Sequence, residues 1–408
     1  MILSSLRATL QLLRSRFSGV ASIRDMFAAV TAYKVAETLY FSFALAFVFK
    51  AVGFQGALVF FAFQCCVLAG GYWGALWLMA RSAWWSARTL QGSGVLIGVG
   101  LSVAGVLPTP EWSMAALLVA ASASGAAIAA KQWHELTRTA GAVRESYLAL
   151  AQATGAMIRV GGLGLCALLL GALHNDVHRF FVITGLVVAA LIVWAGPLKA
   201  AVPVPEAPHP GKPLRTRAFW SNAPFFLLEA GGSAVRDLVG VTGALTIVGS
   251  VSGYGWLSTT SAVVSTMAMV WLAGRPIHEP SFARLRLGLV GVAIGWLSFA
   301  GALVWPLLLA LSMVVMAFAA PLVGASYDSL VMKSMESAGA SLQSNAVARE
   351  LLLLLARGVA MALTAGLTVW ATTPRGMLFI ALGLTLATLP LEYALAHRLA
   401  RGSKAATT

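Results

Sequence analysis

Charge is scarce in this sequence. Only 10% of the 408 residues are Asp, Glu, Lys or Arg, whereas 59% are hydrophobic and the mean hydropathy is +0.84. A soluble chain of this length would form two or three domains with charged surfaces. Instead, apolar windows long enough to cross a bilayer recur from one end of the chain to the other. The composition therefore indicates a polytopic membrane protein.

Cysteine is also rare. Cys65, Cys66 and Cys166 all lie inside expected helices, so a disulfide framework is not indicated. Adjacent cysteines on a helix point in different directions, which favours small apolar side chains over a metal site. A short polar run from His174 to His178 could hold a metal, but such a loop is more often simply hydrated. No metal or other cofactor is expected.

Sequence signs of catalysis are missing. No glycine-rich phosphate loop ending in Lys-Ser or Lys-Thr occurs, so a built-in ATPase is unsupported. No nucleophile and base, and no ligand cluster, fall at a common depth in the expected helices. We therefore expect a protein that is not an enzyme.

Acidic residues are outnumbered two to one, with 14 Asp and Glu against 28 Lys and Arg. The net charge of +14 could suggest a nucleic-acid partner, so the positions of the basic residues must decide. If the N-terminus is cytoplasmic, 21 basic residues lie on that side and only Lys50, Arg179 and Arg375 lie on the other. This positive-inside bias predicts a bacterial inner-membrane protein with both termini cytoplasmic. No soluble module remains to bind nucleic acid.

Windows of about 17 to 25 apolar residues between charged or Pro/Gly breaks predict twelve transmembrane helices in an all-α membrane protein. The expected helices cover 27–50, 57–79, 91–107, 112–130, 149–173, 180–197, 222–248, 256–273, 287–304, 307–324, 351–371 and 377–396.

The most polar stretch of the chain falls at its midpoint. Five prolines between 203 and 213 favour extended chain there. Six helices on each side of such a linker predict two pseudo-symmetric six-helix bundles. The expected parts are a cytoplasmic amphipathic segment 1–26, an N-terminal bundle 27–197, a Pro-rich linker 198–221, a C-terminal bundle 222–397 and a tail 398–408.

Short sequence similarities between the two halves indicate that the chain arose by internal duplication. Arg144-Glu145 precedes the fifth helix, and Arg349-Glu350 precedes the eleventh 205 positions later. Arg81 follows the second helix and Arg275 the eighth, 194 positions apart. In a duplicated transporter the substrate lies at the interface between the halves.

The six-linker-six plan, the cytoplasmic termini and the short exterior loops resemble the major facilitator superfamily over nearly the whole chain. The run Arg349-Glu350-Leu-Leu-Leu-Leu-Leu-Ala-Arg357 is similar to a signature of a poorly characterised bacterial subgroup, although Leu354 and Ala356 stand where Asn and Gly are common. The loop after the second helix lacks the aspartate usual in the superfamily. Of that pattern it keeps only the basic residues Arg81 and Arg88. The resemblance implies two bundles that rock around a central site, with helices one, four, seven and ten lining it.

Several ionisable residues lie inside expected spans, where each costs at least about 2.5 to 3.5 kcal/mol unless it faces a wet or paired environment. In the first helix, Lys34 and Glu37 share a face near mid-membrane, and Tyr33 and Tyr40 flank them. We expect Glu37 to carry a proton with Lys34 as its counter-charge, and the tyrosines to bind a solute. A permanent Lys34–Glu37 ion pair that fixes helix packing is the alternative.

The seventh helix carries Glu229 and Arg236 two turns apart on one face, where they could meet through water or the solute, with Asp237 pointing elsewhere. A helix starting near Val235 would instead leave Arg236 and Asp237 in a loop, equivalent to Arg24 and Asp25. Arg159, ten residues into helix five, should also face the interior.

The expected functional residues form two sets. The solute and proton pathway comprises Tyr33, Lys34, Glu37, Tyr40, Gln152, Arg159, Glu229, Arg236 and Asp237. The gating set comprises Arg81, Arg144, Glu145, Arg349, Glu350 and Arg357.

Counting Lys34, Arg159, Arg236 and Arg357 against Glu37, Glu229 and Asp237 leaves the interior one positive charge in excess, which slightly favours an organic anion. The sequence thus predicts a proton-coupled secondary transporter that moves a small organic solute by alternating access and acts as a monomer in the bilayer. The alternative is a facilitator-like assembly factor or sensor, for pigment, metal or organelle biogenesis, that does not transport.

Overall fold

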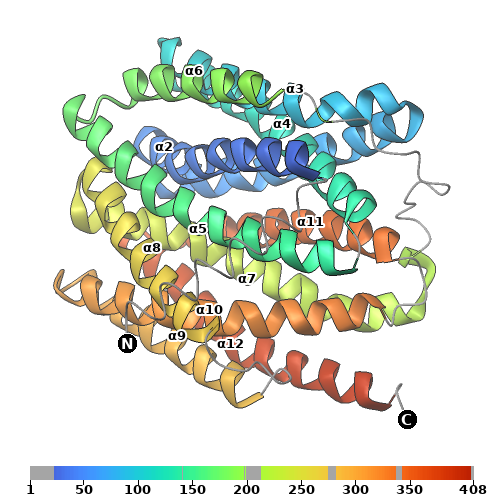
Figure 1. The fold of residues 1–408 in the computed structure, drawn as a ribbon. Helices are drawn as coiled ribbons and strands as arrows, with labels where there is room; N and C mark the ends of the chain where they lie inside the picture. The colour runs from blue at the N-terminus through green and yellow to red at the C-terminus, as the bar shows by residue number, and fades with distance from the viewer. Residues whose placement is uncertain are drawn as a thin grey trace, which may run out of the picture. The chain divides into compact units, whose positions relative to one another are not determined.

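The structure is a computed structural model that describes residues 23–139, 141–196, 198, 213–273, 282–336 and 342–405. Within these ranges the regular elements are eleven α-helices and one short 3-10 helix (Figure 1). The all-α fold expected from the sequence is confirmed. The expected amphipathic segment before residue 23 and most of the Pro-rich linker lie outside the described residues.

The helices are bounded as follows. They are α2 (Arg24–Arg81), α3 (Ala83–Val106), α4 (Pro110–Arg138), α5 (Gly141–Ala172), α6 (Val177–Ala195), η2 (Pro213–Arg215), α7 (Arg217–Val248), α8 (Val251–Ala273), α9 (Phe282–Ala302), α10 (Leu308–Glu336), α11 (Leu342–Thr368) and α12 (Pro374–Ala405).

The 58-residue helix α2 covers the first two expected spans. It is not regular throughout, because Gly53 has φ 70° and ψ −173°, outside the helical region. A residue with a Cβ rarely adopts this conformation, so glycine is what permits the break. Divided at Gly53, the eleven helices become twelve helical segments, the number expected from the sequence.

Helix ends follow local side-chain chemistry. The Ser82 side chain accepts a hydrogen bond from the Trp84 amide at the start of α3, and Asp176 does the same for Arg179 at the start of α6. Thr216 caps α7, so this helix begins five residues before the predicted start at 222. Gly249, with φ 78°, ends α7 in a left-handed conformation.

Most helices have the length and composition of membrane spans. By these two criteria, eight helices in the described part of the chain can cross a bilayer, and the apolar stretch Leu308–Gly324 of α10 is shorter. Helix α7, which carries Glu229, Arg236 and Asp237, is not among the eight, and neither is α8, which is rich in Ser and Thr. The length and composition of these helices are those of an integral membrane protein.

The chain divides into two compact units. Unit 1 holds the described residues before 45 and those from 67 to 198, whereas unit 2 holds Leu45–Cys66 and the described residues from 213 onward. In unit 1, α3 packs along both α4 and α6. In unit 2, α9 packs along α10, and α7 packs along α11 and α12. Compactness assigns Leu45–Cys66 to unit 2, whereas the expected N-terminal bundle 27–197 included it. The boundaries at the linker remain a prediction.

Small residues bring the unit 1 helices close together. A side chain at Gly71 or Gly125 would collide with backbone of the facing helix, at Ser122 and Leu68 respectively. Helices in lipid associate through such close backbone approach because hydrophobic burial supplies little driving force there. The contact fixes α2 against α4 and thereby the positions of the polar side chains on both.

Candidate functional site

The two predicted tyrosines of α2 face α4. Tyr33 and Tyr40 are both fully buried. The Tyr33 hydroxyl lies 3.4 Å from Ser124 Oγ, and the Tyr40 hydroxyl donates to the Leu117 carbonyl at 2.9 Å. Both hydroxyls therefore have partners inside unit 1 in this conformation, and solute binding by them remains a prediction.

Lys34 is partly buried beside α5. Its Nζ lies 3.5 Å from where a Cβ on Gly155 would stand, so the ammonium is close to the backbone of α5. The charges that act on Lys34 are those of Lys131, Glu37, Arg159 and Glu135. Ion pairs in the described residues join other partners, and none links Lys34 to Glu37. The permanent pair considered from the sequence is therefore not formed here.

Two further contacts of unit 1 involve residues that the sequence did not single out as a site. Tyr147 of α5 is buried and donates to Glu135 Oε1 of α4 at 2.7 Å. Arg138 at the end of α4 binds both carboxylate oxygens of Asp25 at the start of α2, at 2.9 and 2.7 Å. Asp25 is thus held by α4, and the polar side chains around Lys34 come from three helices.

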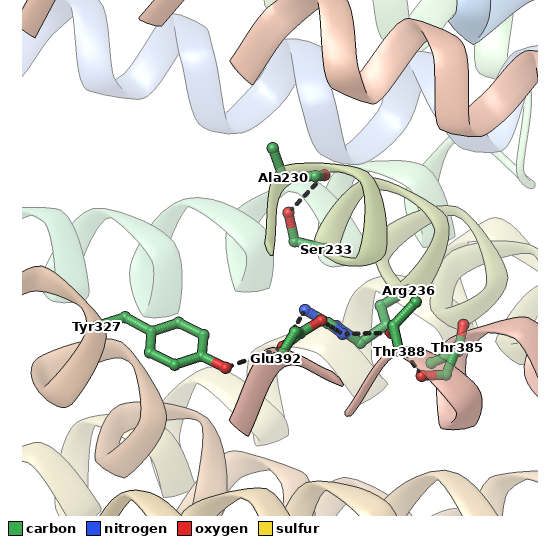
Figure 2. A network of polar contacts seen from close by, with 7 residues as sticks. All are labelled: Ala230, Ser233, Arg236, Tyr327, Thr385, Thr388 and Glu392. Carbon is green, nitrogen blue, oxygen red and sulfur yellow. Dashed lines mark hydrogen bonds and ion pairs between the residues drawn. The ribbon is translucent and has the colours of Figure 1, made fainter. Parts of the chain in front are cut away.

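In unit 2 a buried ion pair joins α7 to α12 (Figure 2). Arg236 Nη1 donates to Glu392 Oε1 at 2.7 Å, and the Tyr327 hydroxyl of α10 donates to Oε2 at 3.0 Å. The Glu392 side chain is 0% exposed and that of Arg236 is 14% exposed. Arg236 also approaches the Thr388 hydroxyl at 3.5 Å.

This network adds a residue that the sequence-based interpretation of helix seven did not contain, and contact of Glu229 with Arg236 through water or the solute stays a prediction. The ion-pair partner of Arg236 is Glu392, because α12 packs on α7 and brings a carboxylate directly to the guanidinium. The alternative start near Val235 is wrong, since α7 runs without interruption from Arg217 to Val248. Arg236 and Asp237 therefore lie inside a helix.

Gly232 makes room for the ion pair. A Cβ at this position would stand 2.7 Å from Glu392 Oε1 and 3.1 Å from both Arg236 Nη1 and Thr388 Oγ1. Contacts this short force neighbouring atoms to move. Glycine one turn before Arg236 is therefore part of the geometry that lets α12 place Glu392.

The other two acidic residues of α7, Glu229 and Asp237, are affected by the positive charges of arginines on α11. The charges that act on Glu229, which is partly buried, are those of Arg349, Arg357, Glu392 and Arg236. The charges that act on Asp237 are those of Arg357 and Arg236. Neither carboxylate makes a hydrogen bond or ion pair within the described residues. Unit 2 thus combines one sealed ion pair with two acids that are not locked in place.

The predicted gating residues are dispersed. Arg81 is exposed and stacks on Trp77 of its own helix, 3.5 Å from the ring centroid. The Arg349 guanidinium lies 5.5 Å from the centroid of Phe226 on α7, and its Nε is buried without a hydrogen-bond partner. Glu350 and Arg357 are partly buried. Their gating roles remain predictions.

Of four further predicted residues, one is exposed and three have side chains that the structure does not describe. Arg159 of α5 is exposed. The structure does not describe the side chains of Arg144, Glu145 and Gln152, and their roles remain predictions.

A cavity of about 810 Å³ lies between α7, α11 and α12 of unit 2. Its walls are mainly leucine, with alanine and threonine, and Gly231, Gly232 and Thr388 belong to its lining. Because Gly232 and Thr388 also border the ion pair, the cavity ends beside the Arg236–Glu392 contact. This cavity could not be predicted from the sequence, since it depends on how three helices pack.

Metal ligands do not converge in the part of the chain that the structure describes: no group of three or more His, Cys, Asp or Glu side chains is placed to hold an ion. The three cysteines are free thiols. In the turn between α5 and α6, His174 and Asn175 have positive φ angles and Asp176 caps α6. That polar run therefore has a local role in turning the chain.

Three solved structures with a similar architecture are described below, and each of the three is a membrane transporter. The chain is similar to the POT family transporter PepTSo (TM-score 0.70, 10% identity, covering 93% of this chain and 98% of that one). It is also similar to the nucleoside transporter NupG (TM-score 0.63, 13% identity, 93% and 98% covered). A third match is a bacterial homolog of the human lysosomal transporter Spinster in an inward-facing, occupied conformation (TM-score 0.59, 12% identity, 93% and 96% covered).

The chain has the major facilitator fold. No protein-family model and no curated protein matches it by sequence. At 10 to 13% identity these likenesses establish architecture alone. The major facilitator fold confirms the resemblance inferred from the sequence and leaves the solute to be argued from the side chains.

Proposed function

We propose that this protein is a secondary active transporter that moves a small organic solute across the bacterial inner membrane by alternating access, with coupling to protons. The observation that carries the proposal is the pair of α7 carboxylates, Glu229 and Asp237. Both lie inside a helix of a membrane protein, and neither has a hydrogen-bonded or ionic partner within the described residues. Such groups are costly in lipid and mark ion or substrate pathways.

The charge expected of the solute must be derived again, because the structure changes the count of charges in the interior. Glu392 cancels Arg236, so the excess of one positive charge derived from the seven sequence-predicted residues disappears. The preference for an anionic group now rests on unit 1. There the charges of Lys131, Arg159, Glu37 and Glu135 act on Lys34, and these five groups carry one net positive charge. We propose that a solute anion approaches Lys34 beside Gly155.

Proton coupling is assigned to Glu37. It lies one turn from Lys34, acts on it electrostatically and is partly buried without an ion pair in the described residues. A carboxylate that is not locked can gain and lose a proton as a solute anion arrives and leaves. Orientation with both termini cytoplasmic, and action as a monomer, complete the proposal.

The test is flux through purified protein in liposomes under an imposed pH gradient. Glu37→Gln should lose gradient-driven accumulation, by at least about tenfold, while keeping solute exchange at equal pH, because the amide cannot carry a proton. The matched control is Glu111→Gln, which alters a carboxylate in the first turn of α4. Gradient-driven flux that is unchanged in Glu37→Gln would count against proton carriage by this residue. A solute that stabilises the protein thermally without any flux would favour a sensor or assembly factor.

A further inference from the structure

A short stretch of α2 is bound to α11 by neutral polar contacts. The Gln55 side chain donates from Nε2 to the Ala365 carbonyl at 2.8 Å, and its Oε1 accepts from the Thr368 hydroxyl at 2.8 Å. Both partners lie in the last turn of α11, and Gln55 lies two residues after the break at Gly53. The amide therefore bridges the kink region of one helix and the end of another.

The same stretch meets α11 a second time without polar side chains. A Cβ on Gly358 would stand 3.2 Å from the Ala62 carbonyl oxygen and 3.3 Å from Cys65 Cβ. The helices approach closely there because glycine offers no side chain. Cys65 is buried and takes part in this contact, so separation of the two helices should increase its exposure.

The placement of this stretch in the chain is unusual. Leu45–Cys66 belongs to unit 2, although the residues on both sides of it along the chain belong to unit 1. The contacts to α11 described above are neutral, and each contributes only modestly to stability. By contrast, separating the buried Arg236–Glu392 pair would leave a charge in a dry environment. The Gln55 contact is thus the one that can open and close at low cost.

We propose that Gln55 and Thr368 form a reversible latch that holds the Leu45–Cys66 segment on α11 and closes the side of the protein predicted to be exterior. This proposal rests on alternating access in the proposed function. Opening breaks the two Gln55 hydrogen bonds and uncovers the Gly358 contact. After opening, Thr368 keeps a partner within α11, because its hydroxyl also bonds to the Ala365 carbonyl at 3.0 Å.

The test follows the reactivity of Cys65 toward a small maleimide in a Cys66→Ala background, since Cys66 is exposed whereas Cys65 is buried. Thr368→Val removes the hydroxyl that binds Gln55 and should raise the alkylation rate of Cys65 by about fivefold, as expected for the loss of one hydrogen bond. Gln55→Ala should raise it further. The matched control is Thr364→Val, one turn earlier on α11, because the Thr364 hydroxyl bonds only within its own helix.

Cys166 on α5 of unit 1 is buried and serves as an internal control for unfolding. Its labelling should stay at the background rate in every variant. Equal Cys65 rates in Thr368→Val and Thr364→Val would overturn the latch. The measurement needs no solute, so a protein that shows the latch but no flux would refute only the proposed function.

Discussion

At the scale of single residues, the structure separates ionisable groups that are locked from those that are not. Arg236 and Glu392 form a closed pair with Tyr327, and such pairs contribute little net stability compared with apolar side chains of similar volume. Breaking one is nevertheless costly, because the remaining charge stays buried. Glu37, Glu229 and Asp237 have no such partner in the described residues, which is why the proposed chemistry is assigned to this group and not to Arg236.

The locked pair gives a prediction about stability. Glu392→Ala should destabilise the protein by roughly 3 to 5 kcal/mol, because it leaves the Arg236 guanidinium buried and uncompensated. The double variant Arg236→Met with Glu392→Leu should recover most of this loss, since it removes both charges. Thermal unfolding in detergent, followed by tryptophan fluorescence, measures both. If the double variant were less stable than Glu392→Ala, a purely structural pair would be the wrong description.

At the scale of the helices, hydropathy predicted most of what the structure contains. Apolar windows located the helical segments because the bilayer fixes their minimum length. The predicted break between 50 and 57 is present and is short: it is the non-helical backbone at Gly53, which separates two helical segments. The predicted start of α7 was late because the Thr216 cap precedes the apolar part of the helix.

The contacts of the site were beyond prediction. Arg236 was recognisable as a residue in need of a partner, but its partner lies 156 positions away on α12. Which carboxylate it meets depends on the rotation of both helices and on the space left by Gly232. Gln55 carried no signal at all, since a glutamine at a helix break is ordinary until its contact with Thr368 is known.

The kink supplies an element-scale prediction. Gly53→Ala places a Cβ at φ 70° and should lower thermal stability by about 1 kcal/mol, or straighten α2 and weaken the Gln55 contact. Gly74→Ala is the matched control within the same helix, because nothing lies within 4 Å of its added Cβ. That change should be neutral or slightly stabilising. Equal effects of the two substitutions on the unfolding temperature would show that the backbone at Gly53 is not constrained.

At the scale of the whole molecule, orientation in the membrane follows from the distribution of basic residues. The side predicted to be exterior carries only three, whereas the other side carries 21. Positive loops are retained in the cytoplasm during insertion. The same assignment places the Gln55–Thr368 contact toward the exterior, so topology and latch can be tested with similar reagents.

Topology is tested by cysteine accessibility in intact cells, in a Cys66→Ala background. An impermeant maleimide should label Arg375→Cys, in the first turn of α12, without permeabilisation. It should label Arg286→Cys, an exposed position near the start of α9, only after the inner membrane is opened. The reverse pattern would invert the predicted orientation and move the proposed latch to the cytoplasmic face.

The contact between Gln55 and Thr368 has a consequence for the conditions under which closure persists. An amide and a hydroxyl do not titrate in the range that cells encounter, and their attraction is not screened by dissolved ions as an interaction between exposed charges is. The strength of this contact should therefore not change with salt concentration, or with pH in the mildly acidic to mildly alkaline range. Sensitivity to the external medium would then have to come from the carboxylates of the interior alone.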